Sequence, residues 1–565
     1  MLYYPLMNGR RLLRLAYFAV LAGTSTACSS KTSEGTAGSG SGGAAGGGTA
    51  PGNGGSAPSA GSFNGGGAPS SAGAGPSLGG SNSSGGNSPS GGESTGGAST
   101  AGAGPTGSAG QGTAGGGTVG TEPQVVTSAN NAWWKTGTLT EMTSATADVT
   151  VNDASVQQTW EGFGGAFNEA GWIYMASLTA ADRAMVMQLL FGVDGAHFAW
   201  GRIPIGASDY SFVNASKDKQ AGRYTLNETA GDNEMKNFSL ERDKKNLIPF
   251  VQAALAIRPD LHLWASPWTP PTWMKSPAKY DGGTMKSDDA TLQAFALYLA
   301  KFVQEYGKLG MKVEAVAPQN EPNFEQGYPS AHWDSATFVK FVRDYMGPTF
   351  MSMNVGANIV LGTMSNGDAD TGIVSAMAAD SKAMGFVKAI GYQWGMQGKN
   401  NPAKSLSFWQ TEHKCGNYPW MGGKGPPAPN DMAYANESWG LIKAWITTDK
   451  VNAYSAWNMV LDPAGDGNDG TRAWYQNALL VVNNGKLVIT PTYYVFRHLS
   501  QFVDPGAKVV GTTGGDAIAF KNPDGTIVAV VYNSGGGKMF TVSVGGKKMQ
   551  FDRPGGGWAT VNYKP

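Results

Sequence analysis

The chain has 565 residues, of which 83 are glycine and only 15% are charged, and its formal net charge at pH 7 is zero. A neutral chain lacks the basic surface of a nucleic-acid-binding protein, and nothing in its charge indicates an anionic partner or a membrane surface.

The first 28 residues are typical of an export signal. Arg10, Arg11 and Arg14 precede a short apolar run at 15–23, which ends in small residues before Cys28 and is too short to span a bilayer. Cys28 followed by two serines is similar to the cleavage site of bacterial lipoproteins. This similarity implies an acylated Cys28 and a location on the outer cell surface; a secreted protein with a simply cleaved signal is the alternative.

Residues 29–121 are predicted to be a tether. Of the 90 residues from 31 to 120, 34 are glycine, one is aromatic and three are charged. Such a segment cannot bury a core, so we expect a disordered linker between the attachment point and the following domain.

Residues 161–462 alternate between short β-rich runs and amphipathic helical stretches, the pattern of a parallel sheet covered by helices. Strands are predicted at 161–166, 198–205, 262–268, 313–319, 359–364, 387–394, 406–411 and 451–459. Helices are predicted at 182–190, 240–257, 291–309, 336–346 and 433–448, and a loop at 395–404. Eight such strands indicate an α/β fold, a closed (β/α)8 TIM barrel.

The sequence pattern changes in residues 463–565, where apolar and polar residues alternate and glycine-rich turns separate the runs. Strands at 517–521, 526–532, 540–544 and 558–563 favour an antiparallel β side domain. Residues 122–160 lead into the barrel, and the run 147–151 has the same alternating character. We therefore expect this run to add a strand to the side domain.

Two glutamates end barrel strands, at the edge where TIM barrels build their active sites. Glu321 follows the fourth strand in PQNEP, and Glu412 follows the seventh in WQTEH. Facing carboxyl groups suit glycoside hydrolysis, in which one protonates the departing oxygen and the other attacks the anomeric carbon or activates water. Tryptophans near strand ends could present flat faces to a sugar: Trp268, Trp273, Trp333, Trp394, Trp409, Trp420, Trp457 and Trp474.

The region from about Trp160 to the C-terminus resembles glycoside hydrolase family 30, which includes glucosylceramidases and endo-β-1,6-glucanases. The resemblance rests on EGFGGAFNEA at 161, RIPIGASDYS at 202, SPWTPPTWMK at 266, APQNEP at 317, WQTEHKCG at 409 and AYSAWNMVLD at 453. It implies a barrel with a β side domain and a retaining mechanism, with Glu321 as acid/base and Glu412 as nucleophile. The positions that match the family's glycone pocket are Asp209, Trp268, Asn320, Trp457 and Asn477, and Trp394 is a further candidate from its place at the sixth strand end.

The sixth strand end reads Gln393-Trp394-Gly395, where the glucosylceramidases of the family carry His-Trp-Tyr. The missing tyrosine removes a hydroxyl beside the nucleophile, and the residues at this strand end are more similar to those of the endo-β-1,6-glucanases. We therefore predict an endo-β-1,6-glucanase that acts on a β-linked glucan. Glucosylceramidase, β-xylosidase and β-1,6-galactanase activities stay open as alternatives.

His413 and Cys415 lie beside Glu412, but the sequence has no CxxC, HxH or HExxH motif, so we expect packing roles and neither a metal nor a cofactor. A surface carbohydrate-binding protein without catalysis is a second class of function, and an adhesin or scaffold is a third. Neither of these needs both Glu321 and Glu412 at strand ends, which favours the enzyme.

Overall fold

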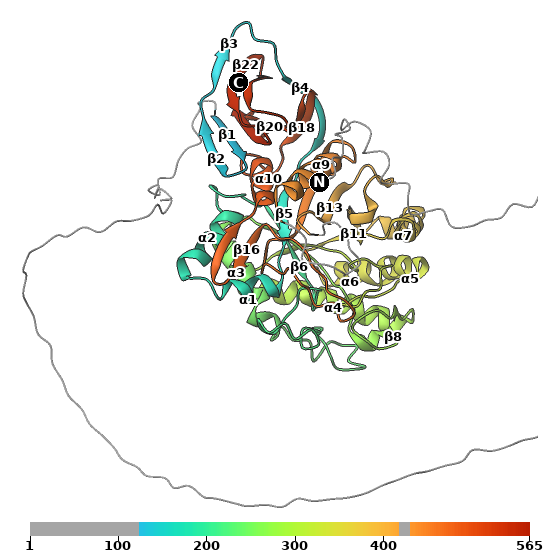
Figure 1. Ribbon diagram of the computed structural model, residues 1–565. Helices are drawn as coiled ribbons and strands as arrows, with labels where there is room; N and C mark the ends of the chain where they lie inside the picture. The colour runs from blue at the N-terminus through green and yellow to red at the C-terminus, as the bar shows by residue number, and fades with distance from the viewer. Residues whose placement is uncertain (1–123, 417–429) are drawn as a thin grey trace, which may run out of the picture. The chain divides into compact units, whose positions relative to one another are not determined.

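The structure is a computed structural model that describes residues 124–416 and 430–565 (Figure 1). The predictions for the export signal, for Cys28 and for the tether lie outside the described residues, and so does Trp420.

Eight parallel strands close into a barrel in the order β10-β11-β12-β13-β14-β5-β6-β7, which confirms the predicted TIM barrel. Their bounds are β5 (Gly162–Ala166), β6 (Trp200–Pro204), β7 (His262–Ser266), β10 (Val313–Val316), β11 (Asn358–Met364), β12 (Val387–Gln393), β13 (Ser407–His413) and β14 (Ala453–Asn458). Each lies within or overlaps one of the eight predicted strands. Their residues are mostly buried, as expected where helices cover a parallel sheet.

The crossover helices lie outside the strands (Figure 1). They are α1 (Glu169–Met175), α2 (Ala180–Phe191), α3 (Leu247–Ile257), α4 (Asp289–Lys308), α5 (Ser335–Lys340), α6 (Gly347–Ser352), α7 (Gly367–Ala379), α8 (Ser381–Met384) and α9 (Met432–Thr447). Several begin at a side-chain cap; the Asp288 carboxylate, for example, accepts from the backbone N–H of Thr291 at 2.9 Å.

Two predicted helices differ from the observed ones, one at its start and one at its end. The helix predicted at 240–257 begins as α3 at Leu247, because Pro249 fits only in a first turn. The helix predicted at 336–346 continues to Ser352: α5 leads into a π-helical turn at Phe341–Met346 and then into α6, where Pro348 lies in the first turn and is tolerated there. The loop predicted after β12 is confirmed, since only a short 3-10 turn, Trp394–Met396, follows that strand.

The side domain is a ten-stranded sheet in the order β2-β1-β23-β20-β19-β18-β4-β21-β22-β3. Its strands are β1 (Gln124–Ala129), β2 (Ala132–Gly137), β3 (Thr140–Met142), β4 (Val149–Thr159), β18 (Lys508–Gly514), β19 (Asp516–Lys521), β20 (Ile527–Asn533), β21 (Lys538–Val544), β22 (Lys547–Arg553) and β23 (Gly557–Tyr563). Figure 1 shows blue and red strands side by side, so both ends of the described chain build this sheet. The strand predicted at 147–151 overlaps β4, which pairs with β18.

The chain does not enter this sheet directly after β14, the last barrel strand. It first forms a small sheet of β15 (Val460–Leu461), β16 (Leu480–Asn483) and β17 (Lys486–Ile489), and then the helix α10 (Pro491–Ser500). This helix was not predicted from the alternating pattern. It begins at Thr490, whose hydroxyl accepts from the N–H of Tyr493, with Pro491 in the first helical position.

Candidate active site

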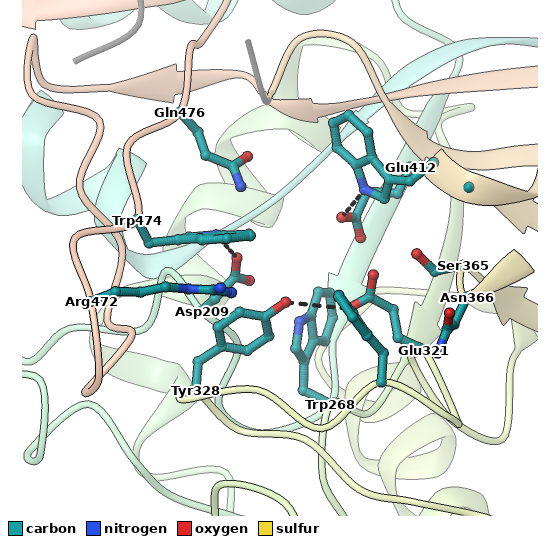
Figure 2. A pocket seen from close by; sticks show the side chains of 13 residues that line it. Asp209, Trp268, Glu321, Tyr328, Ser365, Asn366, Glu412, Arg472, Trp474 and Gln476 are labelled. Atoms are coloured by element: carbon teal, nitrogen blue, oxygen red, sulfur yellow. Dashed lines mark hydrogen bonds between the residues drawn. The ribbon is translucent and has the colours of Figure 1, made fainter. Parts of the chain in front are cut away.

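A cavity of about 290 Å³ lies at the carboxyl ends of the barrel strands (Figure 2). Its position is the one at which TIM-barrel enzymes bind their substrates. The lining residues come from the loops after several strands: Asp209, Trp268, Glu321, Phe324, Tyr328, Ser365, Asn366, Trp394, Gly395, Glu412, Arg472, Trp474 and Gln476. Both glutamates singled out from the sequence, Glu321 and Glu412, are among them.

The backbone holds Glu321 in an uncommon conformation. Its φ is 50°, in the left-handed region that non-glycine residues rarely adopt, and Trp394 has a φ of 32°. The Glu321 N–H donates to the carbonyl of Thr363 at 2.9 Å, which fixes the turn after β10 against β11. Strained backbone held in this way is common at functional sites.

The carboxylate of Glu412 accepts a hydrogen bond on each oxygen. The Arg202 guanidinium contacts Oε2 as a buried ion pair, and the Trp394 indole N–H donates to Oε1 at 2.9 Å. Arg202 is itself fully buried and also donates to Ser266 and Asn320. These two charge-assisted and neutral donors hold the Glu412 carboxyl group in a fixed orientation at the cavity wall.

Glu321 has different surroundings. Its burial, and then the charge of Glu412, raise the pKa of the Glu321 carboxyl to about 8. The Tyr328 hydroxyl donates to Glu321 Oε2 at 3.3 Å. At neutral pH, Glu321 therefore holds a proton, whereas Glu412 is bound by the two donors Arg202 and Trp394, an asymmetry that suits an acid and a nucleophile.

Asp209 lies on another wall of the cavity, where burial and the charges of the two glutamates raise its pKa well above the ordinary value. The Trp474 indole N–H donates to Asp209 Oδ2 at 3.0 Å. The other oxygen, Oδ1, has no hydrogen-bond partner among the described residues. A buried carboxyl oxygen beside a cavity requires a partner, and a ligand hydroxyl would supply one.

The structure brings some of the predicted binding residues to the cavity but not all of them. Asp209, Trp268 and Trp394 line it. Asn320 and Trp457 lie behind its wall: Asn320 Oδ1 accepts from Arg202 at 2.6 Å, and the Trp457 ring stacks on Trp268 with centroids 5.4 Å apart. Trp457 therefore packs against a residue that lines the cavity, and Asn320 binds the arginine that holds Glu412.

Asn477 does not line this cavity. It lines a neighbouring one of about 280 Å³, and the side chain of Gln476 borders both. Of the tryptophans singled out from the sequence, Trp474 lines the cavity, whereas Trp333 is buried near Phe295 and Trp409 donates to Glu161 at the start of β5.

One buried arginine links the loops that carry the cavity walls. Arg223, with a side chain only 3% exposed, donates to both carboxylate oxygens of Asp281 at 2.7–2.9 Å. It also donates to the carbonyls of Gly327 at 2.8 Å and Asn468 at 3.2 Å. Gly327 precedes Tyr328, and Asn468 belongs to the loop that carries Arg472 and Trp474. Arg223 was not singled out from the sequence, because its partners are brought together only by the fold.

His413 and Cys415 have the packing roles predicted for them. Cys415 is buried, and burial raises the pKa of its thiol to about 12. His413 is also buried, and its Nδ1 lies 2.9 Å from the Tyr454 hydroxyl. No group of three or more potential metal ligands occurs within residues 124–416 and 430–565. In the same two ranges, no helix is both long enough and apolar enough to cross a bilayer.

Comparison with known proteins gives matches over most of the described chain. Residues 160–503 match the glycosyl hydrolase family 30 TIM-barrel domain, and residues 506–561 match the beta sandwich domain of the same family. Putative glucosylceramidase 4 of Caenorhabditis elegans is 28% identical over 450 residues, covering 74% of this chain and 83% of the relative. Endo-1,6-beta-D-glucanase neg1 of Aspergillus fumigatus is 27% identical over 428 residues, covering 70% of this chain and 83% of the relative.

A solved structure, that of the endo-β1,6-glucanase BT3312, has the same fold. It superposes with a TM-score of 0.67 at 22% sequence identity, and the match covers 78% of this chain and 99% of that one.

Proposed function

Because the chain belongs to glycoside hydrolase family 30, a family of retaining glycoside hydrolases, we propose that it is an endo-β-1,6-glucanase with Glu321 as acid/base and Glu412 as nucleophile. One observation carries the assignment of roles. Two carboxyl groups line one cavity, where Arg202 and Trp394 donate to Glu412 while the pKa of Glu321 is raised to about 8.

In the first step, an oxygen of Glu412 attacks the anomeric carbon as the glycosidic C–O bond breaks, and the proton of Glu321 moves to the departing oxygen. The sugar is then esterified to Glu412, whose negative charge is lost. That charge is one of the causes that raise the pKa of Glu321, so the pKa of Glu321 falls at this stage.

The lower pKa suits Glu321 for the second step, in which it accepts a proton from water. The water oxygen attacks the anomeric carbon and the ester bond to Glu412 breaks. Two inversions leave the product in the β configuration. Arg202 and Trp394 stabilise Glu412 both as it attacks and as it leaves, since each binds a different carboxylate oxygen.

The walls of the cavity favour a hydroxylated leaving group over a lipid. Asp209, Arg472 and Gln476 are polar groups suited to sugar hydroxyls, and Trp268 and Trp474 offer aromatic surface. Among the exposed large apolar side chains of residues 124–416 and 430–565, Phe324 alone lines the cavity. A ceramide would need a wider apolar surface at the mouth, so these residues support a glucan substrate.

The relatives named glucosylceramidases make the lipid glycoside the second candidate substrate. Product analysis on β-1,6-glucan, β-1,3-glucan, xylan, β-1,6-galactan and glucosylceramide distinguishes the candidates. We expect β-1,6-glucan to be cleaved fastest, with oligosaccharides of many lengths appearing early because cleavage is internal. Faster cleavage of glucosylceramide, or release of monosaccharide alone from the start, would contradict the proposal.

We further propose that the enzyme is exported and held at the outer cell surface through an acylated Cys28. This rests on the arginines, the short apolar run and the Cys-Ser-Ser sequence alone.

A further inference from the structure

Three buried amide side chains form a row that leads from the barrel wall to the catalytic cavity. Asn168 caps α1, Asn458 ends β14, and Gln476 lies in the loop between β15 and β16. Their exposed fractions are 1%, 0% and 5%, and Gln476 borders the cavity.

Each hydrogen bond in the row fixes the orientation of the next amide. Asn168 Oδ1 accepts from the N–H of Gly171 at 2.7 Å, so its Nδ2 faces away from the helix. That Nδ2 donates to Asn458 Oδ1 at 3.3 Å, and Asn458 Nδ2 donates in turn to Gln476 Oε1 at 3.3 Å. Because an amide has one oxygen and one NH2 group, binding Oε1 leaves the Nε2 donors of Gln476 for the cavity.

The backbone of Gln476 is also held in place. Its N–H donates to the carbonyl of Gly465 at 2.9 Å, and the next N–H, that of Asn477, donates to Gly416 at 3.0 Å. A Cβ at Gly465, where φ is 59°, would lie 1.8 Å from the carbonyl oxygen of Gln476. The two backbone segments therefore lie so close together at this point that only glycine fits at position 465.

We infer that Gln476 is a substrate-binding residue that determines sugar specificity, with its amide donating a hydrogen bond to a hydroxyl oxygen of the sugar beside Glu412. This inference rests on the proposed β-glucosidic function. Figure 2 shows Gln476 reaching into the cavity on the side of Trp474 and Glu412. Asp209 and Glu412 carry carboxyl groups, whereas Gln476 offers an uncharged donor. The cavity therefore selects a sugar whose hydroxyls can bind both the carboxyl groups and the amide.

The test compares the wild-type chain with Gln476→Met, which keeps the length of the side chain and removes both amide groups. Gln157→Met on the exposed strand β4 is the matched control. Each protein is assayed on an activated aryl β-glucoside and on its four monodeoxy derivatives, and kcat and KM are determined separately. Asn458→Leu is added because leucine is close to asparagine in size and cannot donate to Gln476 Oε1.

Losing one uncharged hydrogen bond should lower the kcat/KM of Gln476→Met about 3- to 10-fold on the parent glucoside. One of the four deoxy glucosides lacks the hydroxyl that Gln476 binds. On that substrate, Gln476→Met should have no further effect, because the hydrogen bond is already absent. Asn458→Leu should show the same pattern in a folded protein, and Gln157→Met should match the wild type.

Equal loss of kcat/KM on the parent and on all four deoxy glucosides would overturn the inference, as would no loss on any of them. A wild-type chain that cleaves neither the aryl β-glucosides nor β-1,6-glucan would overturn both this inference and the proposed function, whereas an active wild type with equal losses overturns this inference alone.

Discussion

Replacing Glu321 by glutamine removes a carboxyl group that the cavity keeps protonated at neutral pH. The folded chain holds the proton up to a pKa of about 8, whereas the unfolded chain releases it near the ordinary value of 4.5. Between these pH values the folded state binds more protons, so the stability of the wild type falls as pH rises. Glutamine does not titrate, and the stability of Glu321→Gln lacks this contribution.

The size of the effect follows from the shift. Each pKa unit corresponds to about 1.4 kcal/mol. The shift for this buried side chain therefore lowers the free energy of unfolding of the wild type by on the order of 4 kcal/mol at pH 8 and above. We therefore expect the melting temperature of Glu321→Gln to be close to that of the wild type at pH 4.5. The variant should become progressively more stable than the wild type up to pH 8.

Differential scanning fluorimetry from pH 4.5 to pH 9 measures this difference. Glu234→Gln, at an exposed carboxylate paired with Lys236, is the control and should follow the wild type at every pH. The wild-type activity should also fall above pH 8, where Glu321 ionises. A stability difference that does not change with pH, or a Glu321→Gln protein less stable than the wild type at pH 8, would refute the reasoning.

Three further predictions concern single residues. Trp394→Phe keeps the ring but removes the N–H bound to Glu412, and we expect kcat/KM on an activated aryl glucoside to fall about 10-fold; an unchanged value would show that this contact is dispensable. Arg223→Ala should raise KM for β-1,6-glucan more than KM for an aryl glucoside, because the loops it holds form the outer cavity walls; Arg223→Lys should restore part of the loss, and equal changes in both KM values would count against this role. Cys28→Ala should move the protein from the membrane fraction to the soluble fraction in cell fractionation, whereas unchanged fractionation would speak against a lipid anchor.

The barrel could be predicted from the sequence because its strands are buried on both faces. In β11, for example, the apolar residues Ile359 to Leu361 begin a segment that is buried up to Met364, and the polar residue that follows marks the carboxyl edge of the barrel. Glu321 and Glu412 were found in this way, since Glu321 comes shortly after the end of β10 and Glu412 lies at the end of β13.

The loop residues of the cavity could not be predicted in the same way. Tyr328 and Gln476 lie in segments without periodicity, and their positions depend on contacts such as that between Arg223 and Asp281, which are 58 residues apart. Arg202 was missed for another reason: it is a charged residue within a buried strand, and only the position of Glu412 explains its presence there.

The central claim is that Glu412 attacks the sugar, and trapping the covalent intermediate tests it most directly. A 2-deoxy-2-fluoro β-glucoside with a good leaving group slows the second step more than the first, so the sugar stays attached to the nucleophile. After digestion, mass spectrometry should find the fluorosugar on the peptide that contains Glu412, in the wild type and not in Glu412→Gln. Attachment to Glu321 or to any other residue would contradict the account.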